Sequence, residues 1–96
     1  MAKKDHYGMV LWPEYFDINL SKKMGRRISK DLAIPNVNSE DLFKACKRAG
    51  LHPENKPNKA YPSRWFDPRG CVVVMRKHSK SQTIDIVARK ITKKHS

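Results

Sequence analysis

The sequence predicts an α+β fold in which two helices pack on one face of a three-stranded antiparallel sheet. Three observations support this prediction. Two segments repeat apolar residues at helical spacing, one short segment is rich in β-branched residues, and two more are short and extended in character. Their order is strand, long loop, helix, weak strand, loop, strand, helix (βαββα). Since 96 residues are about the size of one domain, we expect residues 1–96 to form a single domain.

The three strands differ in how clearly the sequence marks them. Residues 8–12 form a short apolar run that is stopped by proline, which predicts the first strand. The strongest strand pattern is residues 71–77, because it contains three consecutive valines after a glycine. Residues 51–62 contain two internal prolines, so they predict an irregular edge strand at best.

Both helices are marked by a capping residue and an apolar face. The first is expected at residues 39–49, with Ser39 as its N-cap and Gly50 as its stop. Its apolar face consists of Leu42, Ala45, Cys46 and Ala49. The second begins after a cap at Ser79 or Ser81, and its apolar stripe consists of Ile84, Val87, Ala88 and Ile91.

The charge of the chain points to an anionic partner. Lys and Arg number 21 against nine Asp and Glu, which gives a net charge of +12. Nucleic acid is the commonest polyanion that neutralises such an excess. A membrane surface is the rival partner, but the longest apolar run has five residues, whereas a membrane span needs about 20. We therefore expect a cytoplasmic protein with no membrane insertion.

Metal and cofactor chemistry is not expected. The two cysteines lack CxxC spacing and the histidines are scattered, so buried thiols are the simpler interpretation. Glu14 and Asp17 are the one carboxylate pair worth weighing for metal-dependent nuclease work, and they lack a third acid or a histidine nearby. No phosphate-binding loop or nucleophile elbow is present. We therefore expect no enzymatic activity.

A first basic patch lies within the long loop. Between Ile18 and Lys30 the chain carries five cations and no acid. The cations are Lys22, Lys23, Arg26, Arg27 and Lys30. Gly25 would allow the backbone to approach a phosphate closely, and the adjacent arginines can each fork onto phosphate or a guanine edge. Asn19 and Ser21 add neutral donors. The alternative is a solvated loop that carries these charges by chance.

A second basic patch combines cations with aromatic residues. It consists of Lys56, Lys59, Tyr61, Arg64, Trp65, Phe66 and Arg69. Cations interleaved with aromatic rings suit the unstacked bases of RNA loops. Phe66 and Trp12 are expected in the core, whereas Tyr61 and Trp65 could either fill the core or contact RNA.

Several of these motifs together resemble a known family. WPEYFD at residues 12–17, GRRI at 25–28, GL at 50–51 and NKAYPSRW at 58–65 occur in the same order as in the 19-kilodalton protein family of the signal recognition particle. Arg69 and Gly70, followed by Val72 and Val74, continue the match. The resemblance covers nearly the whole chain, at the length of the compact archaeal form. One departure is Cys71, where the family often has a basic residue, so no RNA contact is expected there.

The resemblance implies both a fold and a function. The fold is βαββα. The function is binding to the S domain of the particle's RNA, where the protein clamps the tetraloop tips of helices 6 and 8 and preorganises the RNA for the GTPase subunit. A structural subunit of the ribosome or of another ribonucleoprotein is the alternative. The resemblance places the RNA contacts in the loops at residues 18–38 and 56–70.

Three expectations concern the state of the free protein. We expect a monomer, whose contact with the GTPase subunit is mainly through the RNA. We expect the segment from Ile18 to Lys30 to be partly disordered without RNA, because it lacks apolar anchors. We also expect a frayed tail at residues 95–96.

Overall fold

The sheet has three antiparallel strands, which are β1 (Gly8–Leu11), β2 (Glu54–Lys56) and β3 (Cys71–Met75). The computed structural model describes residues 8–94, so the frayed tail expected at residues 95–96 lies outside the described residues. The strand order is β1-β3-β2, which puts the valine-rich β3 in the centre. The weak segment is the edge strand β2, and Pro53 and Pro57 flank it rather than interrupt it.

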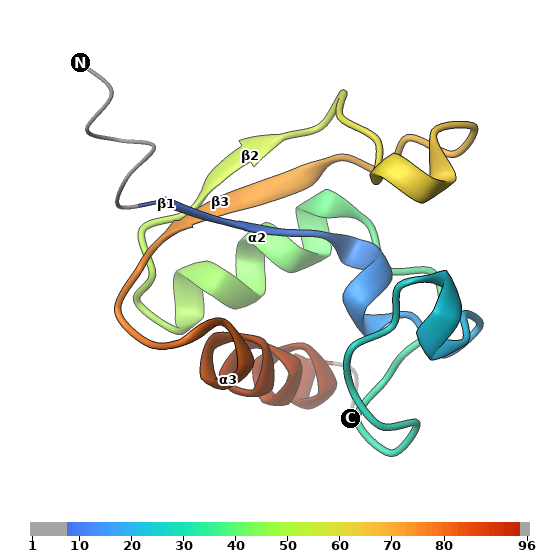
Figure 1. The fold of residues 1–96 in the computed structure, drawn as a ribbon. Helices are drawn as coiled ribbons and strands as arrows, with labels where there is room; N and C mark the ends of the chain where they lie inside the picture. Colours follow the sequence, from blue (N-terminus) through green and yellow to red (C-terminus); the bar gives the residue numbers. More distant parts are fainter. Residues whose placement is uncertain (1–7, 95–96) are drawn as a thin grey trace.

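Two helices, α2 (Ser39–Arg48) and α3 (Lys80–Lys94), cover one face of this sheet (Figure 1). Met9 and Leu11 pair in register with Val74 and Val72, and all four side chains are buried towards the helices. On the other face Val10 and Met75 are exposed. This alternation is typical of an antiparallel sheet with one solvated face, and it confirms the expected fold class.

The helix caps are largely those that the sequence predicts. Ser79 caps α3, because its Oγ accepts a hydrogen bond from the backbone N–H of Gln82 (3.2 Å). The expected cap of α2 was wrong by one residue: Asn38 is the N-cap and accepts from the N–H of Asp41 (2.9 Å). Asn is as good an N-cap as Ser, so a local pattern does not separate the two neighbours. Both thiols are buried as expected, and burial raises the pKa of Cys46 to about 12.

Both long loops leave the sheet at the same end. Leu11 pairs with Val72 and Lys56 pairs with Cys71, so β1 and β2 end where β3 begins. The first loop (residues 12–38) contains two short 3₁₀ helices, Pro13–Phe16 and Lys22–Met24, and the second loop (residues 57–70) contains a third, Pro62–Arg64. Figure 1 shows both loops at this end, the first in blue to green and the second in yellow to orange.

The first loop is anchored in the core, which corrects the expectation that it lacks apolar anchors. Leu20 and Ile28 are buried, and so are Tyr15 and Phe16 at the start of the loop. The base of the loop is closed by two backbone bonds, because the Ile34 N–H donates to Phe16 O (3.0 Å) and the Ile18 N–H donates to Ile34 O (3.0 Å). Because Leu20 and Ile28 anchor this loop, its apolar content gives no reason to expect that it folds only when RNA binds.

Candidate nucleic-acid interface

The two loops pack against each other through Gly25 and Tyr61. Gly25 has a φ of +127°, and a Cβ at this position would lie 3.0 Å from Cε2 of Tyr61. The Tyr61 ring also packs edge-on against Trp12 (5.6 Å between centroids) and Tyr15 (6.1 Å). Tyr61 is therefore partly buried and packed against the core, and Trp12 is likewise only partly buried. Glycine is needed here for its backbone conformation and to make room for Tyr61.

Arg69 is a second link between the loops. Its guanidinium donates hydrogen bonds to Asp17 in the first loop and to Asp67 in the second (3.1 Å to Asp67). The hydrogen bond from Arg69 lowers the pKa of Asp67. Only 19% of the Arg69 side chain is exposed. The sequence predicts that Arg69 contacts RNA, whereas in the structure two carboxylates bind its guanidinium.

Arg26 also differs from its expected role. Its Nε donates to the carbonyl of Ile28 (2.8 Å), and its Nη1 donates to the carbonyl of Leu20 (2.7 Å). Only 9% of Arg26 is exposed. These two nitrogens hold the loop backbone in a tight turn, so in this conformation they are not available as a fork for phosphate or a base. Of the two adjacent arginines, Arg26 therefore stabilises the conformation of the loop.

Arg27 is the exposed member of the pair. Its guanidinium carbon lies 5.1 Å from the centre of the Tyr15 ring, which is the geometry of a cation–π contact. Its backbone N–H donates to the carbonyl of Tyr15 (2.8 Å), so the position of the residue does not depend on its side chain. Arg27 therefore presents its charge to solvent from a fixed backbone.

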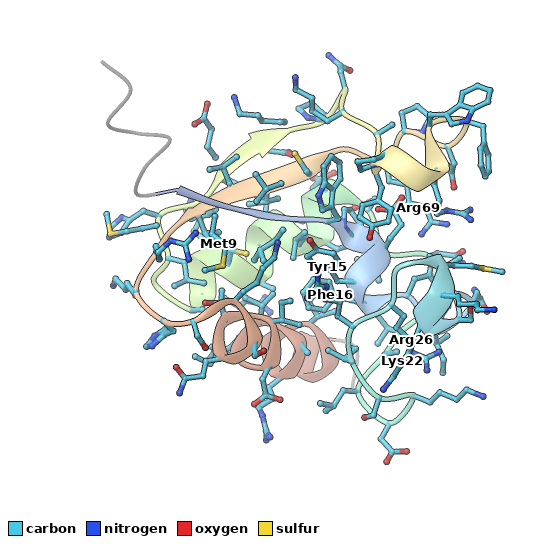
Figure 2. All side chains as sticks on the ribbon, viewed as in Figure 1. Met9, Tyr15, Phe16, Lys22, Arg26 and Arg69 are labelled. Atoms are coloured by element: carbon cyan, nitrogen blue, oxygen red, sulfur yellow. The ribbon has the colours of Figure 1, made fainter. Side chains whose placement is uncertain are left out.

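The remaining candidates in the first loop divide into exposed and structural groups. Lys22, Lys23 and Lys30 are exposed, as is Asn19. Ser21 is exposed too, but its Oγ caps the 3₁₀ helix Lys22–Met24 by accepting from the N–H of Met24 (3.3 Å). Figure 2 shows Lys22 and Arg26 at the end of the molecule that also holds Arg69.

The second loop exposes an aromatic pair. Trp65 is 76% exposed and Phe66 is 59% exposed, and their rings meet edge-on with centroids 5.8 Å apart. The expectation that Phe66 lies in the core was therefore wrong, because the second loop turns outward beyond the sheet. Arg64 lies 5.1 Å from the Phe66 ring centre and also pairs with Asp67 (3.4 Å).

Lys56 at the end of β2 and Lys59 in the second loop differ in their surroundings. Lys59 is exposed, whereas Lys56 is half-buried and pairs with Glu54 (3.3 Å). Both lysines lie near the buried thiol of Cys71, where burial raises the thiol pKa and their charges partly offset that rise. Cys71 itself is buried.

Lys80 is a cation that sequence reasoning missed. It is the first residue of α3, and its Nζ lies 5.2 Å from the centre of the Tyr15 ring, which Arg27 also approaches. Lys80 lies 65 positions after Tyr15 in the sequence, so only the packing of α3 reveals this neighbour. Lys80 extends the cationic surface from the first loop onto the helix.

Glu14 is a buried carboxylate at the junction of the loops. Neither of its carboxylate oxygens has a hydrogen-bond partner among residues 8–94. Burial raises its pKa, and its own backbone N–H and the charge of Arg69 oppose this rise without cancelling it. Asp17 is bound by Arg69, so Glu14 and Asp17 do not form an open metal-binding pair. Across residues 8–94 no cluster of three His, Cys, Asp or Glu side chains could hold a metal ion.

This end of the molecule presents cations that can bind an anion. Its exposed cations are Arg27 and the lysines of the two loops. Of the two acids buried among residues 8–94, Asp17 is bound by Arg69 and Glu14 is shielded from solvent. Within the described part of the chain, no helix has the length and apolar character needed to cross a membrane. A surface of cations and exposed rings is typical of sites that bind single-stranded or looped nucleic acid.

The profile of the family described as SRP19 protein matches residues 10–96. The chain belongs to this family. It is 36% identical over 83 residues to the signal recognition particle 19 kDa protein of Methanopyrus kandleri, an alignment that covers 86% of this chain and 81% of that protein. The family resemblance seen in the sequence motifs is therefore confirmed.

Two solved SRP19 structures resemble this fold. One is the crystal structure of an SRP19 in complex with the S domain of signal recognition particle RNA, with a TM-score of 0.81, 34% identity and coverage of 86% of this chain and 95% of that chain. The other is the SRP19 of Sulfolobus solfataricus in complex with S-domain RNA, with a TM-score of 0.71, 28% identity and coverage of 93% and 92%. The SRP19 fold is thus the fold of this chain, as the βαββα expectation required.

Proposed function

We propose that this protein binds the S domain of signal recognition particle RNA and acts as an assembly factor of the particle. Its family is one of RNA-binding particle subunits and not of enzymes. The observation that carries the proposal is that Tyr61 and Arg69 join two cation-bearing loops into one surface. Two solved relatives of this chain are bound to S-domain RNA.

The finer proposal is that each loop contacts one RNA hairpin tip, at the tetraloops of helices 6 and 8. In the first loop, Lys22, Lys23, Arg27 and Lys30 would bind phosphates or purine edges, with Asn19 as a neutral donor. At the end of β2 and in the second loop, Lys56, Lys59 and Arg64 would bind phosphates, and Trp65 would stack on a base. Gly25, Arg26, Tyr61, Arg69 and Ser21 act as the framework that fixes these groups.

These framework residues matter because they set the distance between the RNA-contacting groups of the two loops. Gly25 against Tyr61 and Arg69 against Asp17 link the loops directly. A fixed spacing lets the protein hold two hairpins side by side, and part of the ordering entropy of the RNA is then met before the GTPase subunit arrives. The protein would act in the cytoplasm as a monomer and influence the GTPase subunit mainly through the RNA.

A ribosomal or other ribonucleoprotein subunit was the alternative function. The family match and the RNA held by the solved relatives favour the signal recognition particle. Direct competition distinguishes the two: S-domain RNA should displace the protein from a ribosomal RNA fragment of equal length, and the reverse should not occur.

The proposal is tested with RNA variants in a binding titration. The S domain is compared with two versions in which the tip of helix 6 or of helix 8 is replaced by an unrelated stable loop. We expect each replacement to weaken binding, and the affinity of the GTPase subunit for the RNA to rise only when both tips are intact. Equal affinity for all three RNAs would contradict the two-tip grip.

A further inference from the structure

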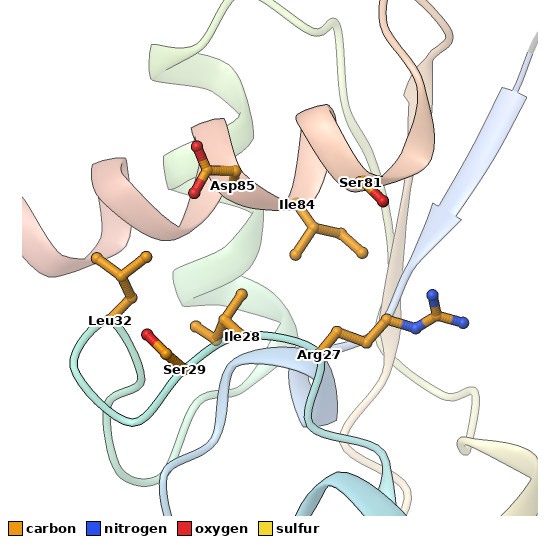
Figure 3. A pocket seen from close by; sticks show the side chains of 7 residues that line it. All are labelled: Arg27, Ile28, Ser29, Leu32, Ser81, Ile84 and Asp85. Atoms are coloured by element: carbon orange, nitrogen blue, oxygen red, sulfur yellow. The ribbon is translucent and has the colours of Figure 1, made fainter.

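A surface pocket lies between the first loop and the start of α3 (Figure 3). It has a volume of about 300 Å³, is open to solvent, and is lined by Arg27, Ile28, Ser29, Leu32, Ser81, Ile84 and Asp85. Small-molecule sites run from about 300 to 1,000 Å³, so this pocket has room for one ring system and not for a larger ligand. It adjoins the proposed RNA surface, because Arg27 belongs to both.

The pocket has an apolar floor and a polar rim. Figure 3 shows Ile28 from the loop and Ile84 from α3 facing each other across it, and both are buried. The hydroxyls of Ser29 and Ser81, the Arg27 side chain and the Asp85 carboxylate surround this floor. A flat apolar ring with hydrogen-bonding edges fits such a site, which is the chemistry of a nucleobase splayed out of an RNA loop.

The charge around the pocket favours RNA over a neutral ligand. Arg27 and Lys80 both lie beside Tyr15, within 5.1 and 5.2 Å of its ring centre, at the loop side and the helix side respectively. Arg27 lines the pocket and Lys80 directly precedes the lining residue Ser81, so both cations can hold the phosphates that flank a bound base.

Asp85 is the informative exception, because it is the single acid among the seven lining residues. A carboxylate next to RNA phosphates weakens binding unless it accepts hydrogen bonds. A carboxylate only accepts, and guanine presents two donors, N1–H and N2–H, on its Watson–Crick edge. Adenine presents an acceptor at N1, which a carboxylate repels. The pair that Asp85 forms with Arg89 (3.2 Å) is exposed, so the carboxylate is free to exchange partners at little cost.

We infer that this pocket takes one unpaired guanine of the bound RNA, with the ring lying over Ile28 and Ile84 and its Watson–Crick edge on Asp85. The inference rests on the proposed function, because the guanine belongs to the RNA that the two loops hold. It extends the RNA site from the loops onto α3.

The first test compares Asp85→Asn with Glu40→Gln in a titration with S-domain RNA. The control is matched, because Glu40 pairs with Lys44 on α2 at the same i,i+4 spacing as Asp85 with Arg89. If both acids acted only by repulsion, both variants would bind RNA more tightly. The guanine pocket instead predicts that Asp85→Asn weakens binding roughly tenfold, while Glu40→Gln does not. Binding of Asp85→Asn that equals or exceeds wild-type binding would overturn the inference.

The second test locates the base with kethoxal, which reacts with N1 and N2 of unpaired guanine. Wild-type protein should protect one guanine that Asp85→Asn and Ser29→Phe leave reactive, while protection elsewhere persists. Ser29 is exposed, so Ser29→Phe fills the pocket from outside without disturbing the core. Guanine protection that is the same in all three proteins would overturn the inference. A wild-type protein that does not bind S-domain RNA would instead overturn the proposed function.

Discussion

Arg26 and Arg27 are adjacent in the chain, and their guanidinium groups face different surroundings. Arg26 donates to two backbone carbonyls of its own loop, whereas Arg27 lies exposed beside Tyr15. A buried carbonyl that loses its donor retains the cost of its desolvation. The energetic contribution of Arg26 therefore belongs to folding, and that of Arg27 belongs to binding.

Substitutions at these two neighbouring positions should therefore affect different quantities, stability at Arg26 and RNA affinity at Arg27. Arg26→Ala should lower the free energy of unfolding by about 1–3 kcal/mol, because the Leu20 and Ile28 carbonyls lose their donors. Arg27→Ala should leave stability nearly unchanged and should weaken RNA binding by about 1–3 kcal/mol if the contact is a forked one to a base. Urea denaturation and RNA titration measure the two quantities, and each variant is the control for the other. The reverse pattern would contradict the assignment.

Glu14 should give the protein a specific pH dependence. Its folded-state pKa is raised above its ordinary value of 4.5 by burial, so the native state binds its proton more tightly than the unfolded chain does. The contribution of Glu14 to stability is therefore present below about pH 4.5 and falls as pH rises through the raised pKa. Asp67, with its lowered pKa, acts in the opposite direction at lower pH.

Thermal melting of wild type and Glu14→Gln between pH 4 and pH 8 isolates this effect. The difference in stability should shift in favour of the variant as pH rises, since Gln does not ionise and Asp67 contributes to both proteins alike. Parallel pH profiles would show that the Glu14 carboxyl is not perturbed in solution.

At the scale of elements, the strands and helices were predictable because their signals are local. Gly50 ends α2 and Ser79 caps α3 as the sequence indicates, and the apolar stripe of α3 is buried. The loops were less predictable. A charge count does not distinguish Arg26, which donates inward, from Arg27, which faces solvent. Nor does the sequence show that Asp17 and Arg69 meet across 52 positions, or that Phe66 is exposed.

At the contact between the two loops, adding a single methyl group at Gly25 should lower stability. Gly25→Ala introduces a side chain at a φ of +127° and places its Cβ 3.0 Å from the Tyr61 ring. Gly50→Ala is the matched control, because its φ is +71° and nothing lies within 4 Å of its Cβ. Gly50→Ala should cost about 1–2 kcal/mol for the left-handed backbone alone, and Gly25→Ala should cost more, as urea denaturation would measure.

The two glycine variants should also differ in RNA binding. Gly25→Ala displaces the first loop relative to the second and should weaken binding, while Gly50→Ala, at the far end of α2 from the loops, should not. Equal effects of the two substitutions on RNA affinity would contradict a role for Gly25 in setting the spacing of the loops.

At the scale of the whole molecule, the net charge of +12 and the exposed cations of the two loops predict a strong salt dependence. Neutralising roughly six to eight phosphates gives a slope of about −4 to −7 in a plot of log affinity against log salt concentration. Arg27→Ala should reduce the magnitude of the slope by about one if its contact is with phosphate. A slope near zero in the wild-type titration would remove the electrostatic account.

The placement of both loops at one end of the sheet follows from its antiparallel order, and two interloop links fix their spacing. Chemical footprinting of the S-domain RNA with and without the protein tests most directly whether the two loops bind two hairpin tips together. We predict protection at two hairpin tips together, and weaker protection at both when Arg69→Ala removes one of the two links between the loops. Protection confined to one tip, or spread evenly along helical flanks, would contradict a two-loop grip.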